Sequence, residues 1–263
     1  MSSGTSHLVR IAAPIVGLVI VAAGCAATPP VPGPSAAATP ASVAASVAPS
    51  AAIATGIPSG VPDPLPISQA ALKAGPYLIA MENVAGGAGV PDAVITVPDG
   101  WSSIDGWGVN LGGEEEAEWA GITFWSVDEV YAHPCQWDVP KLDPGSTVEG
   151  LASALVKVPL REATTPADVT LDGYQGKRLD WSVPTDMDFS TCDADSEGTG
   201  FFSWTGTGAA SLRYQQGPGQ VDRLWILDIG GARLVIDAMS MPGTSDATIA
   251  EMVQIVESID FEP

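Results

Sequence analysis

Basic residues and histidine are scarce in this sequence of 263 residues. Ten Lys and Arg stand against 31 Asp and Glu, which gives a formal net charge of -21, and there are two His. A protein surface that binds nucleic acid needs a stripe of Lys and Arg that displaces the counterions of the phosphates. Anionic lipid also attracts proteins through clusters of Lys and Arg. The composition therefore excludes nucleic acid and electrostatic docking on anionic lipid. It also excludes His-based metal clusters, and we expect neither a metal nor a cofactor.

The apolar run near the N-terminus is too short to span a bilayer. Arg10 precedes the thirteen uncharged residues Ile11–Ala23, whereas a membrane-spanning helix needs about 20 apolar residues. A positive residue, a short apolar run and then small residues are typical of an export signal.

The export signal ends at a cysteine. Residues Val21-Ala22-Ala23-Gly24-Cys25 resemble the lipobox of bacterial lipoproteins, in which the Cys receives a diacylglyceryl group and becomes the new N-terminus. The resemblance implies removal of residues 1–24, lipidation of Cys25, and an extracytoplasmic protein anchored to the cell membrane by that lipid. The alternative is an ordinary signal peptide with an incidental Cys.

Residues 25–67 are expected to form the lipidated Cys and a flexible tether. The stretch Ala26–Pro66 holds twelve Ala, ten Pro and a single charged residue, Asp63. Frequent Pro removes backbone donors and favours extended polyproline II, and the stretch has no large apolar face to fold.

The remaining residues, 68–263, are expected to form one α+β globular domain. Short apolar alternations bounded by Gly, Pro and Asp predict that strands outnumber helices. The predicted strands are Tyr77–Met81, Ala93–Val97, Trp107–Leu111, Gly121–Val127, Gln175–Val183, Gly200–Thr205, Leu212–Gln216, Asp222–Ile229 and Ala232–Met239.

Helical periodicity is found in two segments. Thr147–Val156 has apolar residues on one face, and so does the segment from Ile249 to Ile259. Thr248 with Glu251, or Ser245, would cap the second helix, and Gly230-Gly231 predicts a tight hairpin between the last two strands. The expected fold is an antiparallel β-sheet packed with helices, ending in a β-hairpin and an amphipathic C-terminal helix.

Two short motifs support this fold by resemblance. Val97-Pro98-Asp99-Gly100-Trp101 and Gly173-Tyr174-Gln175-Gly176-Lys177 resemble segments of PsbP-like and LpqN-like bacterial domains, and the resemblance spans most of residues 90–263. It implies an antiparallel sheet sandwiched by helices, with a final hairpin and a terminal helix. It implies no catalytic residue, because members include binding, chaperone-like and assembly-assisting proteins.

Cys135 and Cys192 are the two cysteines left for side-chain pairing after export. An oxidising compartment favours a disulfide between them. The alternative is a reactive Cys135 thiol beside His133, but no Asn or Asp is placed by motif to orient the imidazole ring.

Two acidic stretches are candidates for chemistry. The spacing of an EF-hand calcium loop is matched at positions one, three, five and twelve by Asp186, Asp188, Ser190 and Glu197. Position six, where the sharp turn of such a loop requires Gly, is Thr191. The second stretch is Glu114-Glu115-Glu116 with Glu118, where paired carboxylates could serve a glycosidase. We expect solvated loops at both places.

The sequence therefore predicts a cell-envelope lipoprotein whose acidic domain is a non-enzymatic binding module for an envelope protein or small ligand. The alternative is a secreted carboxylate-dependent hydrolase that acts on envelope carbohydrate. A cleft with two nearby carboxylates, one of raised pKa, would favour the hydrolase.

Overall fold

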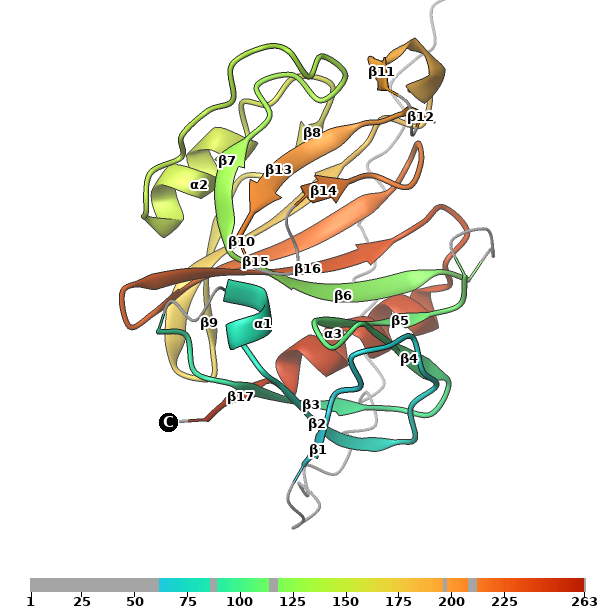
Figure 1. Cartoon of the computed structure of the whole chain (residues 1–263), viewed down its shortest axis with the longest axis vertical. Coiled ribbons are helices and arrows are strands. Elements are labelled where there is room, and N and C mark those ends of the chain that lie inside the picture. Colours follow the sequence, from blue (N-terminus) through green and yellow to red (C-terminus); the bar gives the residue numbers. More distant parts are fainter. Residues whose placement is uncertain (1–61, 86–88, 114–117, 196–197, 208–211, 263) are drawn as a thin grey trace, which may run out of the picture. The chain divides into compact units, whose positions relative to one another are not determined.

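The computed structural model describes residues 62–85, 89–113, 118–195, 198–207 and 212–262 (Figure 1). Cys25, the expected export signal and most of the expected tether lie outside these ranges. None of the helices in the described part is long and apolar enough to cross a bilayer.

An eight-stranded antiparallel sheet, the central sheet, organises the domain. The strand order is β4-β5-β6-β16-β15-β10-β8, with β9 beside β10 as well. The strands are β4 (Trp101–Ile104), β5 (Gly108–Leu111), β6 (Ala120–Trp125), β8 (Glu162–Ala163), β9 (Ala167–Leu171), β10 (Tyr174–Ser182), β15 (Val221–Ile229) and β16 (Ala232–Ser240).

Both faces of the central sheet are covered, so alternate residues of one strand enter different cores. Trp225 and Leu227 of β15 join one core, while Leu224 and Ile226 join the other. This explains why β15 and β16 are buried along most of their length, since side chains of a strand alternate between the faces of its sheet.

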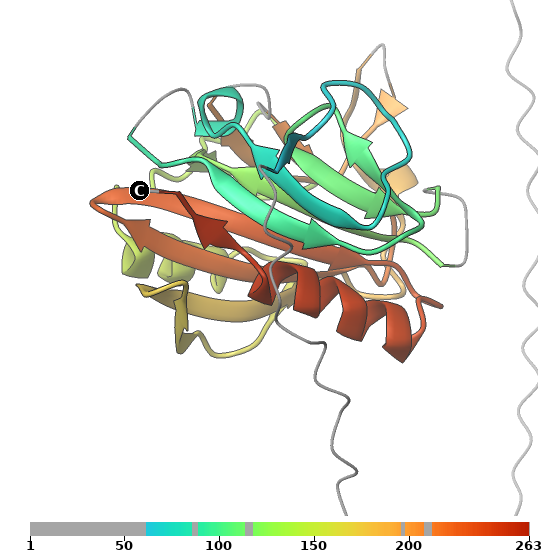
Figure 2. The ribbon, with the colours of Figure 1, turned by 90° about the horizontal axis from the view of Figure 1, so that it is seen from below.

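The first face is covered by α3 (Asp246–Glu257) and by a second sheet of order β1-β2-β3-β17. Its strands are β1 (Asp63–Pro64), β2 (Gly75–Ile79), β3 (Ala93–Val97) and β17 (Asp260–Phe261), and the short helix α1 (Glu82–Ala85) follows β2. Figure 2 shows α3 and β17, in red, beside the blue-green strands of this sheet.

The opposite face is covered by α2 (Val148–Leu155) and by the outer sheet, of order β14-β13-β7 (Figure 1). The outer sheet consists of β7 (Val127–Val130), β13 (Phe202–Gly206) and β14 (Leu212–Tyr214). Beside it lie the 3-10 helix η1 (Phe189–Thr191) and the short pair β11 (Ala194–Asp195) and β12 (Gly198–Thr199).

Tryptophans fill the space between the outer and central sheets. The rings of Trp181 and Trp204 stack with centroids 5.9 Å apart, and Trp125 meets Trp204 edge-on at 5.7 Å. Aromatic rings contribute large buried areas, so this cluster anchors the outer sheet.

The α+β architecture, mostly antiparallel, agrees with the expectation from sequence, and so does the β15–β16 hairpin. Gly230 and Gly231 have φ angles of 62° and 96°, which glycine adopts without the strain that a Cβ would bring. Ser245 is the N-cap of α3 and accepts a hydrogen bond from Thr248 N at 3.2 Å.

Several details differ from the expectation. Strands β4, β8 and β9 are not among the predicted strands, and further sheets, as well as helices, cover the central sheet. The chain continues past α3 into β17, which pairs with β3. The strand predicted over Gly121–Val127 is two strands, β6 and β7, because the chain leaves the central sheet at Ser126 for the outer sheet. Folded structure also begins inside the expected tether, where β1 pairs with β2 and Leu65 is buried. Burial of the Leu65 side chain in the core favours an ordered backbone here, although prolines surround it. Pro64 is tolerated because β1 is an edge strand.

Candidate functional site

Cys135 and Cys192 form a disulfide; their Cα atoms are 4.3 Å apart, and the two residues are 57 positions apart in the sequence. The bridge is buried with Phe201 and Val183 in a small core of its own. The disulfide that the sequence predicts is thus present, and the alternative of a Cys135 thiol activated by His133 is wrong because that sulfur is bonded to Cys192.

Two carboxylates of the loop from Asp186 to Glu197 accept hydrogen bonds from the protein itself. Asp188 Oδ1 accepts hydrogen bonds from the backbone N of Ser190 at 2.9 Å and from its hydroxyl at 2.6 Å. These bonds lower the pKa of Asp188. Asp193 accepts from the backbone N of Trp137 at 2.8 Å. Glu197 lies outside the described residues, and in the described part no group of three or more His, Cys, Asp or Glu could hold a metal ion.

Of the glutamate cluster only Glu118 falls within the described residues; Glu114, Glu115 and Glu116 do not. The Glu118 carboxylate accepts from the Thr248 hydroxyl at 2.8 Å and from Ser245 N at 3.3 Å. These hydrogen bonds lower the pKa of Glu118. Glu118 therefore supports the start of α3, whereas a general acid needs a raised pKa.

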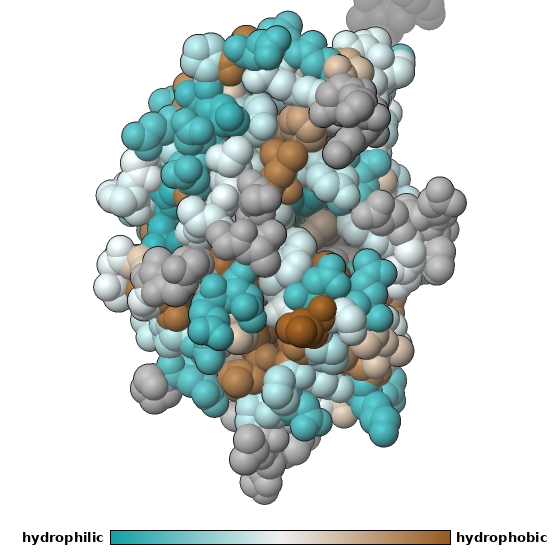
Figure 3. Space-filling model, in the orientation of Figure 1, coloured by the Kyte–Doolittle hydropathy of each residue, from teal (hydrophilic) through white to brown (hydrophobic). Residues whose placement is uncertain are grey.

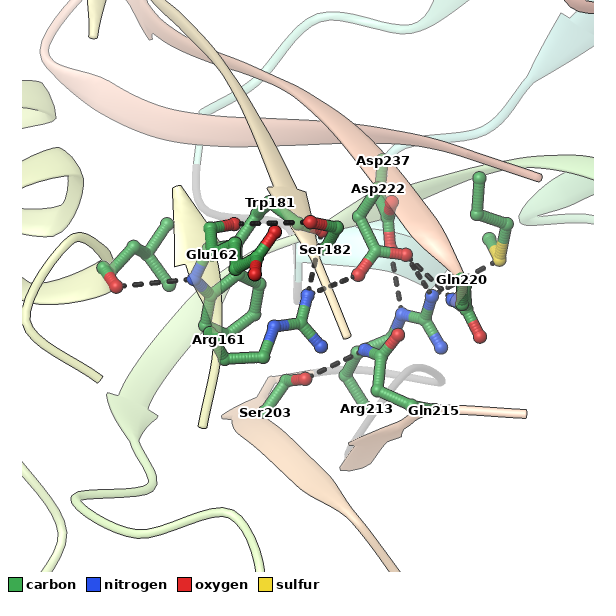
Figure 4. Close-up of polar contacts among 12 residues, drawn as sticks. Arg161, Glu162, Trp181, Ser182, Ser203, Arg213, Gln215, Gln220, Asp222 and Asp237 are labelled. Carbon is green, nitrogen blue, oxygen red and sulfur yellow. Dashed lines mark hydrogen bonds and ion pairs between the residues drawn. The ribbon is translucent and has the colours of Figure 1, made fainter. Parts of the chain in front are cut away.

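Four charged side chains meet in the core and form what we call the buried quartet (Figure 4). Asp222 accepts a hydrogen bond from Arg161 Nη2 on Oδ2 at 2.6 Å and one from Arg213 Nη2 on Oδ1 at 3.0 Å. Arg213 Nε also donates to Asp237 Oδ2 at 2.7 Å. None of these side chains is more than 3% exposed, so water contributes little screening.

The quartet joins separate elements of the fold. Asp222 and Asp237 come from β15 and β16 of the central sheet, Arg213 comes from β14 of the outer sheet, and Arg161 immediately precedes β8. Gln220 adds a hydrogen bond to Asp222 Oδ1 at 2.6 Å. The group therefore fixes how the outer sheet lies on the central sheet.

Burial shifts the pKa values within the quartet. It lowers the pKa of Arg161 to about 10, although Asp222 opposes the change. It raises the pKa of Asp237 to about 7, with Arg213 opposing and Asp222 adding to the rise. A buried carboxyl with a raised pKa can indicate a catalytic acid, but Asp237 is fully enclosed and lines neither of the hollows described below.

Sequence reasoning missed the quartet, although a signal was present. Asp222 and Asp237 lie within strands whose residues are mostly apolar. A charged residue in a strand that is buried on both faces needs a buried partner, which points to the few arginines of the chain.

Two adjoining hollows lie where the β15–β16 hairpin turns. The first, of about 540 Å³, lies between the start of α2 and strands β9 and β10. The second, of about 740 Å³, extends toward β7 and Val90. They share Ser146, Gly231, Ala232 and Arg233, and we call the pair the hairpin groove.

Arg233 occupies the middle of this groove and binds backbone oxygens. Its guanidinium donates to the carbonyl groups of Gly145, of Thr147 at 3.2 Å and of Val127 at 2.7 Å. Arg233 therefore holds the segment before α2 and the start of β7 against the hairpin, which gives the groove defined walls.

The surface offers few other candidate sites. On the face shown in Figure 3, hydrophilic side chains predominate and apolar ones are scattered. The most exposed large apolar residue in the described part is Ile67, at 80%, and single apolar residues on a surface are normal.

Comparison with known proteins finds a distant likeness among the solved structures. No protein-family model matches the chain, and no curated protein sequence matches it. Among solved structures the chain is similar to LpqN, which is involved in cell envelope biogenesis of Mycobacterium tuberculosis. The identity is 14% and the TM-score 0.37, over 68% of this chain and 89% of that chain. A likeness at this level assigns no function.

Proposed function

We propose that this chain is a lipid-anchored extracytoplasmic protein whose disulfide-linked domain is a non-enzymatic binding module of the cell envelope. The observation that carries the proposal is the Cys135–Cys192 disulfide, because such bonds form and persist in oxidising compartments. The export signal and Cys25 at the N-terminus support the same location and supply the anchor.

The contacts of Glu118 and Asp237 favour a binding module over a hydrolase that uses either of them as its acid. Glu118 is held by the start of α3 with a lowered pKa. Asp237, with a raised pKa, is enclosed with Arg213 in the core. A glycosidase needs an acid and a second carboxylate on either side of a substrate, and neither residue faces one of the hollows.

The anchor is tested by Cys25→Ser in a bacterium that processes lipoproteins. The variant should move from the membrane fraction to the medium or periplasm, because several acyl chains hold a protein far more firmly than one. Thr28→Ser is the matched control and should stay with the membrane. Mass spectrometry should find the diacylglyceryl group on the N-terminal peptide of the control. Retention of the Cys25→Ser protein on membranes washed in high salt would contradict the proposal.

The non-enzymatic part is tested separately. The purified protein is incubated with peptidoglycan and cell-wall polysaccharide, and released reducing ends are measured. We expect no release above a heat-denatured sample. Release that is abolished by Glu118→Gln would establish the hydrolase instead.

A further inference from the structure

The hairpin groove carries more negative than positive charge. The carboxylates that line it are Asp128, Asp143, Glu149, Asp168 and Asp228, and the one basic side chain among its described lining residues is Arg233. Lys177 lies beside the groove and pairs with Asp168 at 2.5 Å. Four of the five carboxylates therefore have no ion-pair partner in the described part of the chain.

Arg233 does not cancel this charge by direct pairing. Its Nη1 and Nη2 atoms donate to backbone carbonyl oxygens, as described above. Carboxylates act on it only through space: burial lowers the pKa of Arg233, and Asp143 and Asp128 oppose that change. The guanidinium thus builds the wall of the groove. Asp143 and Asp228 each accept one backbone hydrogen bond, from Gly145 N and Gly231 N, on a single oxygen, and the side chains of Asp128 and Glu149 make no hydrogen bond or ion pair within the described part of the chain.

The groove also has the size and the walls of a binding site. Its hollows of about 540 and 740 Å³ compare with the roughly 300–1,000 Å³ of typical ligand sites. Its walls are regular elements. Thr147 caps the start of α2, and its side chain accepts a hydrogen bond from Gly150 N at 3.0 Å. The hairpin turn is held by a hydrogen bond from Gly231 N to Asp228 Oδ1 at 2.6 Å.

We propose that the hairpin groove binds a cationic segment of a partner protein, with its Lys or Arg side chains directed at the groove carboxylates. The inference rests on the proposed function and names the partner class of that binding module. Carboxylates pair with guanidinium and ammonium groups through charge-assisted hydrogen bonds. The net charge of -21 draws such a segment toward the surface, and a concave acidic site concentrates that attraction. Two joined hollows suit an extended segment better than one small cation.

The experiment uses the full lipidated chain in neutral detergent and a fluorescein-labelled octapeptide of alternating Lys and Ser. Binding is followed by fluorescence anisotropy at physiological ionic strength, where the Debye length of about 8 Å suppresses long-range attraction. The test variant is Asp128→Asn with Glu149→Gln, which removes one exposed carboxylate from each hollow. We expect its Kd for the peptide to rise about tenfold.

The matched control is Asp186→Asn with Glu257→Gln, which removes the same charge from exposed positions that line neither hollow. Its Kd should change by less than about twofold. Equal losses in both variants would assign the binding to general surface charge and overturn the proposal, as would the absence of binding to the unaltered chain. A Kd for spermine at least tenfold below that of the peptide would assign the groove to small polyamines instead. Each of these failures leaves the location and turnover tests of the proposed function unaffected.

Discussion

The guanidinium Nε of Arg213 donates to Oδ2 of Asp237 over 2.7 Å, with the arginine side chain 3% exposed and the aspartate 0%. The two residues belong to different sheets, since Arg213 lies in β14 and Asp237 in β16. Each would be a costly buried charge without the other. The pair therefore favours one position of the outer sheet on the central sheet, because a shift would separate the two buried charges.

Replacing the arginine of this pair while keeping the aspartate should destabilise the protein strongly. Arg213→Met keeps an apolar side chain of similar length but leaves Asp237 and one oxygen of Asp222 without their arginine. We expect the free energy of unfolding, measured by urea denaturation, to fall by about 3–5 kcal/mol.

A half-exposed arginine provides the control for this change. Arg178 pairs with Asp180 at 3.8 Å, and both side chains are 42% exposed, so Arg178→Met should cost less than about 1 kcal/mol. The double variant Arg213→Met with Asp237→Leu should recover part of the loss. Equal losses from the two single variants would mean that the quartet does not hold the sheets together.

The raised pKa of Asp237 predicts a pH dependence of stability. Burial raises this pKa from 3.8 to about 7, so between these values the folded protein retains a proton that the unfolded chain releases. The stabilisation from Asp237 is complete below its unfolded pKa and is lost as the pH rises through about 7. Relative to Asp237→Asn, the unaltered protein should therefore lose stability from pH 4 to pH 7.

Urea denaturation of both proteins at several pH values measures this difference. Other titrating groups are common to both proteins, so their effects cancel in the comparison. A difference that is constant with pH, or one that grows in favour of the unaltered protein as the pH rises, would show that the pKa of Asp237 is not raised.

Two aspartates of β15 show where sequence reasoning stops. Asp222 and Asp228 lie on the same face of this strand, at alternating positions with Leu224 and Ile226 between them. Asp222 is buried and Asp228 is exposed. The difference arises because Gln220 and the arginines of the quartet cover one end of the strand, whereas the other end lines the groove. Periodicity identifies the strand and its faces, but it contains no information on how far a second sheet extends over it.

Glu251 gives a second example. Its spacing from Thr248 fits a capping box, yet its Oε1 accepts a hydrogen bond from Trp101 Nε1 at 2.7 Å, and Ser245 caps the helix. The disulfide was predictable because two cysteines allow one pairing. The contact of Trp101 with Glu251, 150 positions apart, depends on the complete fold.

The disulfide should contribute measurably to stability. Cys135 and Cys192 are separated by 57 positions, and closing a loop of this length stabilises the native state by about 4 kcal/mol in the chain-entropy model. The double variant Cys135→Ser with Cys192→Ser should show this loss in urea denaturation, and non-reducing peptide mapping of the unaltered protein should recover both cysteines in one linked fragment. Quantitative labelling of two free thiols in the native, air-exposed protein would contradict the pairing.

The loop from Asp186 to Glu197 should respond to calcium no differently than to magnesium. A specific calcium site would stabilise the fold by about 2.7 kcal/mol at a hundred times its Kd. In the structure, however, Asp188 already accepts two hydrogen bonds from Ser190. Millimolar calcium and magnesium at equal ionic strength should therefore raise the melting temperature alike, through screening of a very acidic chain. Asp188→Asn should leave both shifts unchanged, because Asn also caps a helical turn well. A shift that only calcium produces, and that Asp188→Asn or Glu197→Gln abolishes, would make this loop a metal site.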